Sequence, residues 1–368
     1  KESIIQDHTR IISCLPFINE LIKKKAKIII VSHLGRPNGK KVPELSLIPI
    51  YKYLKKNLET NVFFFMGELD NDIKEKFSYQ KEGEVILMEN IRFFEEESKD
   101  DENFSKKLAS LCDVYINDAF SCSHRKQASI HKITKFVSQS YAGPLLKKEI
   151  EAINLITKNK RKPVTCIIGG SKISSKIDVI ISLIKKVDSI IIVGAMANNF
   201  LNYKGYNVGK SLTEDNTEEI INKIYKEAKK ENCEIFIPED CKVSLKFSGK
   251  GENKKLGDIS DNEIILDIGT RTIQKINQKI DISNTVLWNG PAGYFENENF
   301  KEGTISIAKK ISDNTKFKSL ISILGGGDTL SAIKKSGEKL SFTHLSTAGG
   351  AFLEYLEGKD LPGLIVLK

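Results

Sequence analysis

The amino-acid sequence predicts an α/β protein with two doubly wound, mostly parallel-sheet (Rossmann-like) domains joined by a hinge helix. Three observations support this fold class: the length of 368 residues, the recurrence of short Ile- and Val-rich runs after helix-period segments, and a charge-rich, helix-like stretch midway along the chain. At roughly 150 residues per domain, the length favours two domains, each able to bury its own core. Alternating helices and continuous apolar strands are typical of a parallel sheet with helices on both faces.

The expected strands are continuous apolar runs that end on glycine, polar or charged residues. They span residues 26–31, 84–88 and 113–116 in the first half, and residues 164–168, 189–193, 234–237, 285–288, 320–324 and 344–346 in the second. We therefore expect a first domain over residues 1–146, a hinge helix and linker over residues 147–163, a second domain over residues 164–350, and a C-terminal segment over residues 351–368.

Composition indicates a globular protein of a reducing compartment. The chain is 40% hydrophobic and 29% charged, and its six cysteines form neither a CxxC pair nor a repeated spacing. No apolar run reaches the roughly 18 residues that a membrane span needs, and the first residues lack a signal-peptide pattern. The formal charge of +9 is spread over many lysine-containing segments, which favours a solvated surface over a nucleic-acid-binding stripe. We expect a cytoplasmic protein with no nucleic-acid or membrane partner.

Arginine and histidine residues follow the expected strands of the first half, where ligands bind in open α/β sheets. The segments are residues 32–37 (SHLGRP), 89–93 (ENIRF) and 117–125 (NDAFSCSHR), which deliver Arg36, Arg92, Arg125, His33 and His124 to one edge. Any one arginine is more often an exposed surface residue. Guanidinium groups bind phosphate and carboxylate oxygens bidentately, however, so three strand-end arginines together with Arg10 predict an anion site.

Glycine-rich turns follow the expected strands of the second half. They are residues 169–172 (GGSK), 194–198 (GAMAN), 288–293 (WNGPAG), 325–329 (GGGDT) and 347–350 (TAGG). We expect four of them to open directly onto helices, whose N-termini and backbone N–H groups bind phosphate. We also expect Lys172 and Lys176 to lie on one helix face, aimed at the same anion, and Asp328 to hold Mg²⁺. The pattern predicts a nucleotide polyphosphate site.

Other catalytic and nucleotide-binding motifs are not satisfied. Residues 205–211 (GYNVGKS) are one residue short of the P-loop spacing and follow no apolar strand, so we predict a loop there. No GxGxxG opens a helix, which argues against a dinucleotide-binding fingerprint. His33 and His124 belong to no nucleophile motif, and there is no HExxH, so a hydrolytic triad or zinc protease has little support.

With these residues in view, the chain resembles the phosphoglycerate kinase family over essentially its whole length. The matching motifs occur in the family's order: residues 7–11 (DHTRI), 32–37, 89–93, 117–120 (NDAF), 169–172, 288–291 (WNGP), 325–329 and 347–354 (TAGGAFLE). The resemblance implies a monomeric, Mg²⁺-dependent kinase of glycolysis and gluconeogenesis. Such an enzyme interconverts 1,3-bisphosphoglycerate plus ADP with 3-phosphoglycerate plus ATP, and its lobes close to bring the two substrates together.

The resemblance also implies roles for individual residues. Phosphoglycerate would be bound by Arg10, His33, Leu34, Gly35, Arg36, Arg92 and Arg125. The nucleotide would be bound by Gly170, Lys172, Lys176, Gly194, Gly269, Asn289, Pro291, Glu296, Gly326, Gly327, Asp328 and Thr329, with Asp328 on the metal. Arg10, Lys172, Gly326 and Gly327 would act on the transferred group, and the final segment near residues 357–368 would return to the first domain. The acceptor is a carboxylate that is ionised at neutral pH, so no general base is needed.

The sequence departs from the family pattern in several places. The family begins with a strand followed by an Asp and an Asn that also hold phosphoglycerate, and this chain starts after that point. We therefore expect the first strand to be absent and phosphoglycerate to bind weakly. Ala195 stands where the family usually has glycine, and Thr270 where it usually has proline, which leaves purine selectivity open. A nucleotide-binding module without catalysis is the alternative, although the presence of both halves of a transfer site argues against it.

Overall fold

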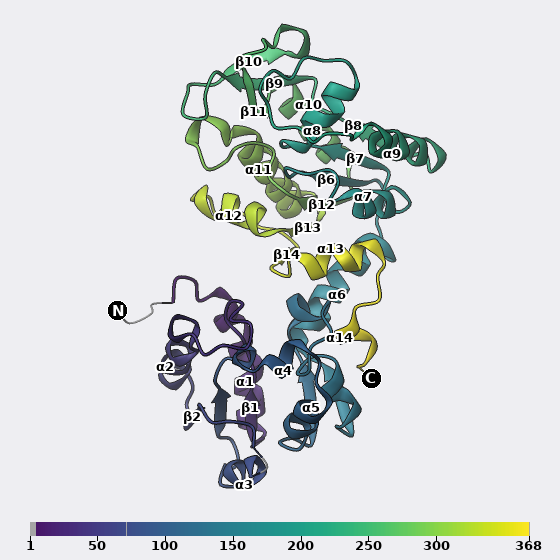
Figure 1. The fold of residues 1–368 in the computed structure, drawn as a ribbon. Coiled ribbons are helices and arrows are strands. Elements are labelled where there is room, and N and C mark those ends of the chain that lie inside the picture. Colours follow the sequence, from purple (N-terminus) through teal and green to yellow (C-terminus); the bar gives the residue numbers. More distant parts are fainter. Residues whose placement is uncertain (1–4, 71, 368) are drawn as a thin grey trace. The chain divides into compact units, whose positions relative to one another are not determined.

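The computed structural model describes residues 5–70 and 72–367, so the residues that begin the sequence lie outside the described part. The chain divides into two compact units. Unit 1 comprises Lys1–Lys148 together with Asp360–Lys368, and unit 2 comprises Glu149–Lys359. Helix α6 (Pro144–Thr157) carries the chain from the first unit into the second (Figure 1).

Unit 1 contains short parallel strands and small helices. Its strands are β1 (Ile28–Ile30), β2 (Val62–Phe65), β3 (Val85–Met88), β4 (Val114–Asn117) and β5 (Gln139–Ala142). The order β1-β3-β2 makes one parallel sheet, and β4 pairs with β5 in a second. Its helices are α1 (Thr9–Lys23), α2 (Ile48–Asn57), α3 (Ile73–Ser78), α4 (Glu95–Ser98), α5 (Glu102–Ala109) and α14 (Pro362–Ile365).

Strand β3 shows why this half of the sequence reads as continuous apolar runs. Val85 and Leu87 pack into a cluster with residues of α1 and α2, whereas Ile86 and Met88 pack into a cluster with α3 and α5. All four side chains are buried. Successive side chains of a strand point to opposite faces, so a strand covered on both faces needs apolar residues at every position.

Unit 2 is built on a six-stranded sheet whose order is β14-β13-β12-β6-β7-β8. These strands are β6 (Val164–Ile168), β7 (Ser189–Ile192), β8 (Glu234–Phe236), β12 (Thr285–Asn289), β13 (Ile321–Gly325) and β14 (His344–Ser346). Every neighbouring pair is parallel. The helices are α7 (Ile177–Ile184), α8 (Met196–Tyr203), α9 (Glu218–Lys230), α10 (Thr270–Ile282), α11 (Glu302–Phe317), α12 (Gly327–Lys335) and α13 (Gly350–Glu357). The mostly parallel α/β fold is confirmed.

Helices cover both faces of this sheet (Figure 1). Ile167 and Trp288 pack against a cluster that includes residues of α10 and α11. On the opposite face, Cys166 and Leu287 lie beside residues of α7 and α13. The alternation along β6 and β12 again explains the unbroken apolar runs at these positions.

Some elements were not predicted. Strands β9 (Asp240–Ser244), β10 (Glu252–Lys255) and β11 (Ile264–Ile268) form a small antiparallel sheet in unit 2 with the order β10-β9-β11. Strand β10 carries the sequence ENKK, which has no apolar run, and the β9–β11 register shifts between Ile265 and Asp267. β2 and β5 in unit 1 were also missed. Polar strands such as β10 lack the pattern that signals a strand, whereas β2 (VFFF) and β11 (IILDI) are apolar runs that the sequence does show.

The predicted C-terminal segment divides differently in the structure. Residues 351–359 remain in unit 2, because α13 packs against α7 and the Ser182 hydroxyl donates to the Leu356 carbonyl at 3.0 Å. Only Asp360–Lys368 belongs to unit 1. There the Gly363 backbone N–H donates to the Ser123 carbonyl at 2.8 Å, and the Asn117 amide donates to the Gly363 carbonyl at 3.0 Å.

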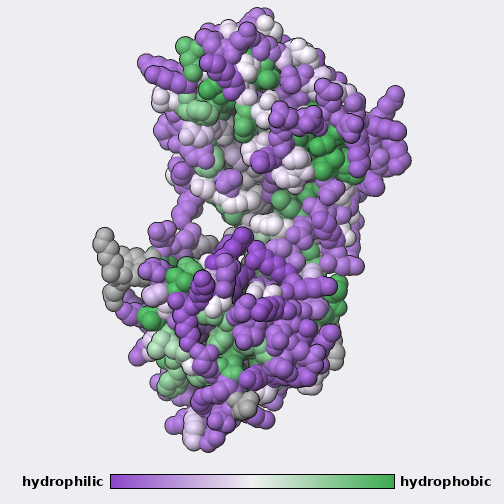
Figure 2. Space-filling view, in the orientation of Figure 1, coloured by the Kyte–Doolittle hydropathy of each residue, from purple (hydrophilic) through white to green (hydrophobic). Residues whose placement is uncertain are grey.

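The surface seen in Figure 2 is mostly hydrophilic. On the face seen in Figure 2, hydrophilic residues dominate both units, and the hydrophobic areas are small and scattered. Among the described helices, none combines the length and the apolar character required to cross a bilayer.

Candidate active site

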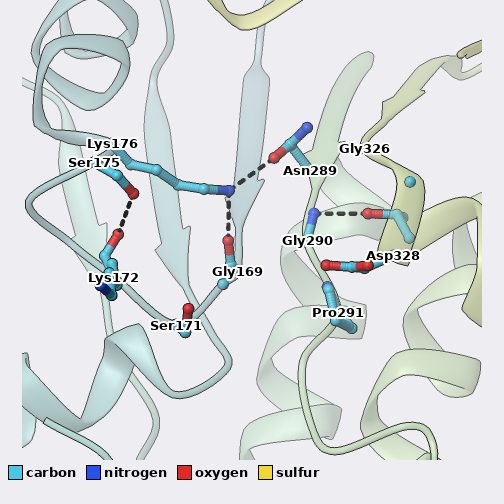
Figure 3. A pocket seen from close by; sticks show the side chains of 13 residues that line it. Gly169, Ser171, Lys172, Ser175, Lys176, Asn289, Gly290, Pro291, Gly326 and Asp328 are labelled. Carbon is cyan, nitrogen blue, oxygen red and sulfur yellow. Dashed lines mark hydrogen bonds between the residues drawn. The ribbon is translucent and has the colours of Figure 1, made fainter. Parts of the chain in front are cut away.

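A pocket of about 190 Å³ lies in unit 2 beyond the carboxyl ends of β6, β12 and β13. Figure 3 shows loops from these three strands converging on it. It is lined by Gly169, Gly170, Ser171, Lys172, Ser175, Lys176, Asn289, Gly290, Pro291, Gly326, Gly327, Asp328 and Thr329. The position matches the expectation that ligands bind at the strand ends of an open α/β sheet.

The floor of the pocket requires glycine at two facing positions. Gly290 adopts φ +99°, and a Cβ there would lie 2.3 Å from the Gly169 carbonyl oxygen. The Gly169 N–H donates to the Asn289 carbonyl at 2.8 Å. The loops after β6 and β12 therefore approach each other closely, as only residues without a side chain allow.

Lys176 joins these two loops through its side chain. Its ammonium donates to the Gly169 carbonyl at 2.7 Å and to the Asn289 Oδ1 at 2.8 Å, as drawn in Figure 3. The stem runs beside Cys166 and Leu287, and this burial lowers the pKa of Lys176 below its usual value, while Asp328 opposes the shift. A partly desolvated ammonium held at the pocket wall is suited to bind an anion.

The expectation that Lys172 and Lys176 share a helix face is wrong. Helix α7 begins at Ile177, and both lysines lie in the irregular segment that precedes it. Lys176 occupies the N-cap position, whereas Lys172 is exposed four residues earlier. Lys176 hydrogen-bonds to the loops after β6 and β12, which draws this segment towards the sheet before the helix begins.

Lys172 brings a second ammonium group to the lining of the pocket. Across the described residues, the structure gives its ammonium no hydrogen bond and no ion pair. Its backbone is held instead, because its carbonyl accepts a hydrogen bond of 3.0 Å from the Ser175 hydroxyl (Figure 3). The charge of Lys172 is therefore available to a ligand.

Helix α12 supplies the third wall. Gly326 adopts φ +97° just before the helix begins at Gly327, and Asp328 lies exposed in the first turn. The Thr329 hydroxyl accepts a hydrogen bond of 2.7 Å from the Gly290 N–H, which ties the helix to the loop after β12. The helix N-terminus brings backbone N–H groups and a partial positive charge to the pocket.

The turns differ from the prediction in how they join helices. Three of them open directly onto α8, α12 and α13, but the turns after β6 and β12 do not, because α7 and α11 begin only at Ile177 and Glu302. The prediction of four helix-opening turns is therefore wrong. Glycine at a strand end is needed for close backbone approach as well as for helix starts, and sequence alone does not separate the two uses.

Three residues predicted to bind nucleotide, Gly194, Gly269 and Glu296, do not line this pocket. Gly194 adopts φ +69° and packs against the backbone of Gly170 and Pro291, while Gly269 packs against the Asp240 carboxylate. Their binding roles remain predictions.

Ser175 also lines the pocket, and sequence reasoning missed it. It lies between Lys172 and Lys176, so a search of the segment that joins the two lysines could have found it.

The predicted anion-binding residues of unit 1 also come together. Burial, together with the positive charges of Arg92, Arg125 and Arg10, lowers the pKa of His33 to about 4. The pKa of Arg92 is also lowered, first by burial and then by the positive charges of Arg125 and Arg36. His33 is therefore neutral at pH 7, and the arginines carry the positive charge of this cluster.

Some members of the arginine cluster also shape the backbone around it. The Arg92 guanidinium donates to the Gly35 carbonyl at 2.8 Å, and the Asn90 amide donates to the Leu34 carbonyl at 2.8 Å. Arg125 contacts its neighbour His124, with 3.1 Å between Nε and Nε2. The segment after β3 thus holds the segment after β1 in place, which sequence spacing alone could not show.

A metal site made wholly of protein groups is absent from residues 5–70 and 72–367, where no group of three His, Cys, Asp or Glu side chains is arranged to hold an ion. Asp328 offers a single carboxylate at the mouth of the pocket. That donor set fits Mg²⁺, which is commonly held by one or two carboxylates together with substrate phosphates and water.

Comparison with known proteins identifies the family. Residues 1–359 match the family described as phosphoglycerate kinase. The chain is 44% identical over 370 residues to a phosphoglycerate kinase of Wolbachia sp. subsp. Drosophila simulans, covering 100% of this chain and 92% of the relative. It is 43% identical over 365 residues to that of Chlorobium phaeobacteroides, covering 99% of this chain and 92% of the relative.

Solved structures agree with the sequence comparison. The phosphoglycerate kinase of Coxiella burnetii superimposes with a TM-score of 0.91 at 37% identity, over 100% of this chain and 92% of that one. The enzyme from Pyrococcus horikoshii gives a TM-score of 0.80 at 28% identity with the same coverage. A nucleotide-binding module without catalysis is not favoured. The chain belongs to the phosphoglycerate kinase family, and it is a kinase whose substrates are ATP or ADP and the phosphoglycerates.

Proposed function

We propose that the pocket of unit 2 binds the nucleotide polyphosphate and that the arginine cluster of unit 1 binds the phosphoglycerate. The observation that carries the first assignment is the convergence of Lys172, Lys176 and the N-terminus of α12 on one pocket. Two ammonium groups and a helix N-terminus fit a ligand with several negative charges. Gly326 and Gly327 contribute the backbone at this helix N-terminus, and Asn289, Pro291 and Thr329 shape the wall.

The second assignment rests on charge. Arg10, Arg92 and Arg125 lie near a neutral His33, Arg36 lies near Arg92, and Leu34 and Gly35 follow His33 in the same segment. Phosphoglycerate carries a carboxylate and a phosphate, both of which guanidinium groups bind in a bidentate manner. A neutral imidazole can still donate one hydrogen bond to such a ligand without adding charge.

Phosphoryl transfer on this arrangement needs no general base. A carboxylate oxygen of 3-phosphoglycerate attacks the γ-phosphorus of ATP, and the bond from that phosphorus to the β–γ bridging oxygen breaks with its electrons leaving on ADP. The carboxylate is already ionised, so catalysis consists of alignment and stabilisation of charge. We assign that work to Arg10, Lys172 and the backbone of Gly326 and Gly327, after the two units bring their substrates into line.

Mg²⁺ would be held by Asp328 and would neutralise charge on the nucleotide phosphates when bound. Asp328 lies in the first turn of α12, where its position relative to the pocket is fixed by the Thr329 hydrogen bond. We further propose that the enzyme acts as a monomer in the cytoplasm. Analytical ultracentrifugation of the purified protein tests the monomer.

Steady-state kinetics of two variants test the assignment of the nucleotide to unit 2 and of phosphoglycerate to unit 1. Arg36→Ala should raise the KM for 3-phosphoglycerate about 10- to 100-fold, because an arginine–anion hydrogen bond is worth about 1.5–3 kcal/mol. It should leave the KM for ATP unchanged. Asp328→Asn should raise the Mg²⁺ concentration needed for half-maximal rate. Arg161→Ala, an exposed arginine at the start of unit 2, is the control. If Arg36→Ala changed the KM for ATP and left the KM for 3-phosphoglycerate unchanged, the assignment would be contradicted.

A further inference from the structure

The position of Lys172 depends on its backbone. It lies in the irregular segment between β6 and α7, and its ammonium has no partner among the described residues. A lysine side chain that swings freely loses rotamer freedom when it binds a transferring phosphoryl group. The conformation of the backbone that carries it therefore decides how often the charge is correctly placed.

Glu214, which does not line the pocket, holds this backbone from outside. Its Oε2 accepts hydrogen bonds from the N–H of Ile173 at 2.5 Å and from the N–H of Ser174 at 3.1 Å. Its Oε1 accepts the Ser174 hydroxyl at 2.6 Å. Both carboxylate oxygens are thus engaged by the two residues that follow Lys172.

The same carboxylate forms no ion pair with Lys172. Burial would raise the pKa of Glu214, but the hydrogen bonds from Ser174 and Ile173, helped by the charge of Lys172, lower it overall. Glu214 is therefore ionised at neutral pH. Its oxygens accept hydrogen bonds from the loop and make no ion pair with Lys172, so the ammonium of Lys172 can contact a phosphate.

Glu214 is itself held by helix α8. The Glu214 N–H donates to the Oδ1 of the buried Asn199 at 2.8 Å, and the amide of the buried Asn198 donates to the Leu212 carbonyl at 3.0 Å. Helix α8 is in turn tied to the pocket, because the Met196 N–H donates to the Gly170 carbonyl at 2.8 Å. Hydrogen bonds therefore connect Gly170 to α8, α8 to Glu214, and Glu214 to the backbone that follows Lys172.

We propose that Glu214 is a positioning residue for phosphoryl transfer, which acts through the Ile173–Ser174 backbone to hold Lys172 where it can stabilise the transferring group. This inference rests on the role proposed above for Lys172. The Ile173 side chain is fully buried and holds the loop by apolar packing, whereas Glu214 holds it by hydrogen bonds to the backbone. Removing the carboxylate should release the loop without removing any group that touches the nucleotide.

A double-mutant cycle tests the proposal. Lys172→Ala should lower kcat about 100-fold or more, in line with the loss of one donor to a transition-state charge. Glu214→Ala should lower kcat about 10-fold or more while the KM for ATP changes less than about 2-fold, as expected for a group that acts in the transition state. In the Lys172→Ala background, Glu214→Ala should lower kcat no further. Glu214→Gln keeps one acceptor oxygen and should restore part of the rate.

A control variant separates positioning from folding. Asp188→Ala removes a carboxylate that also binds a backbone N–H, that of Val164 at 2.8 Å, but at the opposite end of β6. It should lower the unfolding midpoint in urea without changing kcat. The same unfolding curves show whether each Glu214 variant is folded.

The outcomes are distinguishable. If Lys172→Ala leaves kcat unchanged, the proposed role of Lys172 fails. If Lys172→Ala lowers kcat but Glu214→Ala either leaves kcat unchanged or lowers it equally in both backgrounds, Glu214 does not act through Lys172 and the inference is overturned.

Discussion

Replacing Lys176 by methionine tests whether this side chain is a phosphate ligand or a structural brace. The substitution removes the ammonium and keeps a long apolar stem beside Cys166 and Leu287. Two hydrogen bonds are lost, to the Gly169 carbonyl and the Asn289 side chain. Hydrogen bonds to a charged group are worth about 1.5–3 kcal/mol each, so the loss alone would destabilise the fold.

Burial of the Lys176 ammonium has the opposite effect on the stability of the fold. It lowers the pKa of Lys176, which shows that the charged form is less favourable in the folded protein than in water. The effective cost of burying one ion is several kcal/mol, comparable with the two hydrogen bonds. We therefore expect Lys176→Met to change the free energy of unfolding by less than about 2 kcal/mol. Loss of one charged phosphate contact should weaken ADP binding about 10- to 100-fold.

The assay is isothermal titration calorimetry with ADP, alongside urea unfolding of the same preparations. Lys185→Met is the matched control, because Lys185 lies at the other end of α7 and its ammonium is 3.9 Å from the carboxylate of the half-buried Glu227. The control should bind ADP normally. An unchanged ADP affinity together with a loss of more than about 3 kcal/mol in unfolding free energy would show that Lys176 only braces the loops.

Three further predictions concern stability. Gly290→Ala should destabilise the protein by about 1–3 kcal/mol or more in urea unfolding, because it combines a positive φ with a Cβ placed against the Gly169 carbonyl. Gly257→Ala, where a Cβ meets nothing within 4 Å, is its control, and equal unfolding midpoints for the two would refute the argument.

Burial raises the pKa of Asp267 to about 7, so the stability this group gives is complete below its unfolded pKa and is lost as pH rises through 7. Unfolding curves should show that the wild type loses stability relative to Asp267→Asn between pH 4 and pH 7. A difference in unfolding free energy that stays constant over this range would contradict the raised pKa of Asp267. The pKa of His33 is lowered to about 4, so the unfolded chain binds a proton that the folded chain does not, and stability should fall from pH 6.5 to pH 4. His33→Gln should show a shallower fall, and identical pH profiles would argue against the buried neutral imidazole.

The central parallel strands of unit 2, β6, β7 and β12, were predictable because every residue in them is buried. Residues 164–168 of the predicted run coincide with β6, and residues 344–346 with β14. The antiparallel sheet was not predictable in the same way, since β10 is the polar sequence ENKK and is stabilised by pairing with β9 rather than by burial of its own side chains. Pairing between distant segments leaves no local period in a sequence.

The candidate site was predicted in its residues more than in its geometry. The strand-end rule located Lys172, Lys176, Asn289 and Asp328, which all line one pocket. Periodicity placed the two lysines on a helix, whereas tertiary hydrogen bonds hold Lys176 ahead of it. The contribution of Glu214 was invisible to sequence reasoning, because it acts on backbone N–H groups about 40 residues away in the chain, at Ile173 and Ser174.

The return of Asp360–Lys368 to unit 1 bears on the order in which the protein can be completed during synthesis. Unit 2 is one continuous stretch, so all of its strands have left the ribosome once residue 359 has emerged. Unit 1 is begun first and finished last, because the Asn117 amide and the Ser123 carbonyl find their partner only when Gly363 arrives. In a nascent chain, unit 2 can therefore be complete before unit 1 is. A truncated chain that ends at residue 359 should have a unit 1 that proteases cut more readily than unit 2.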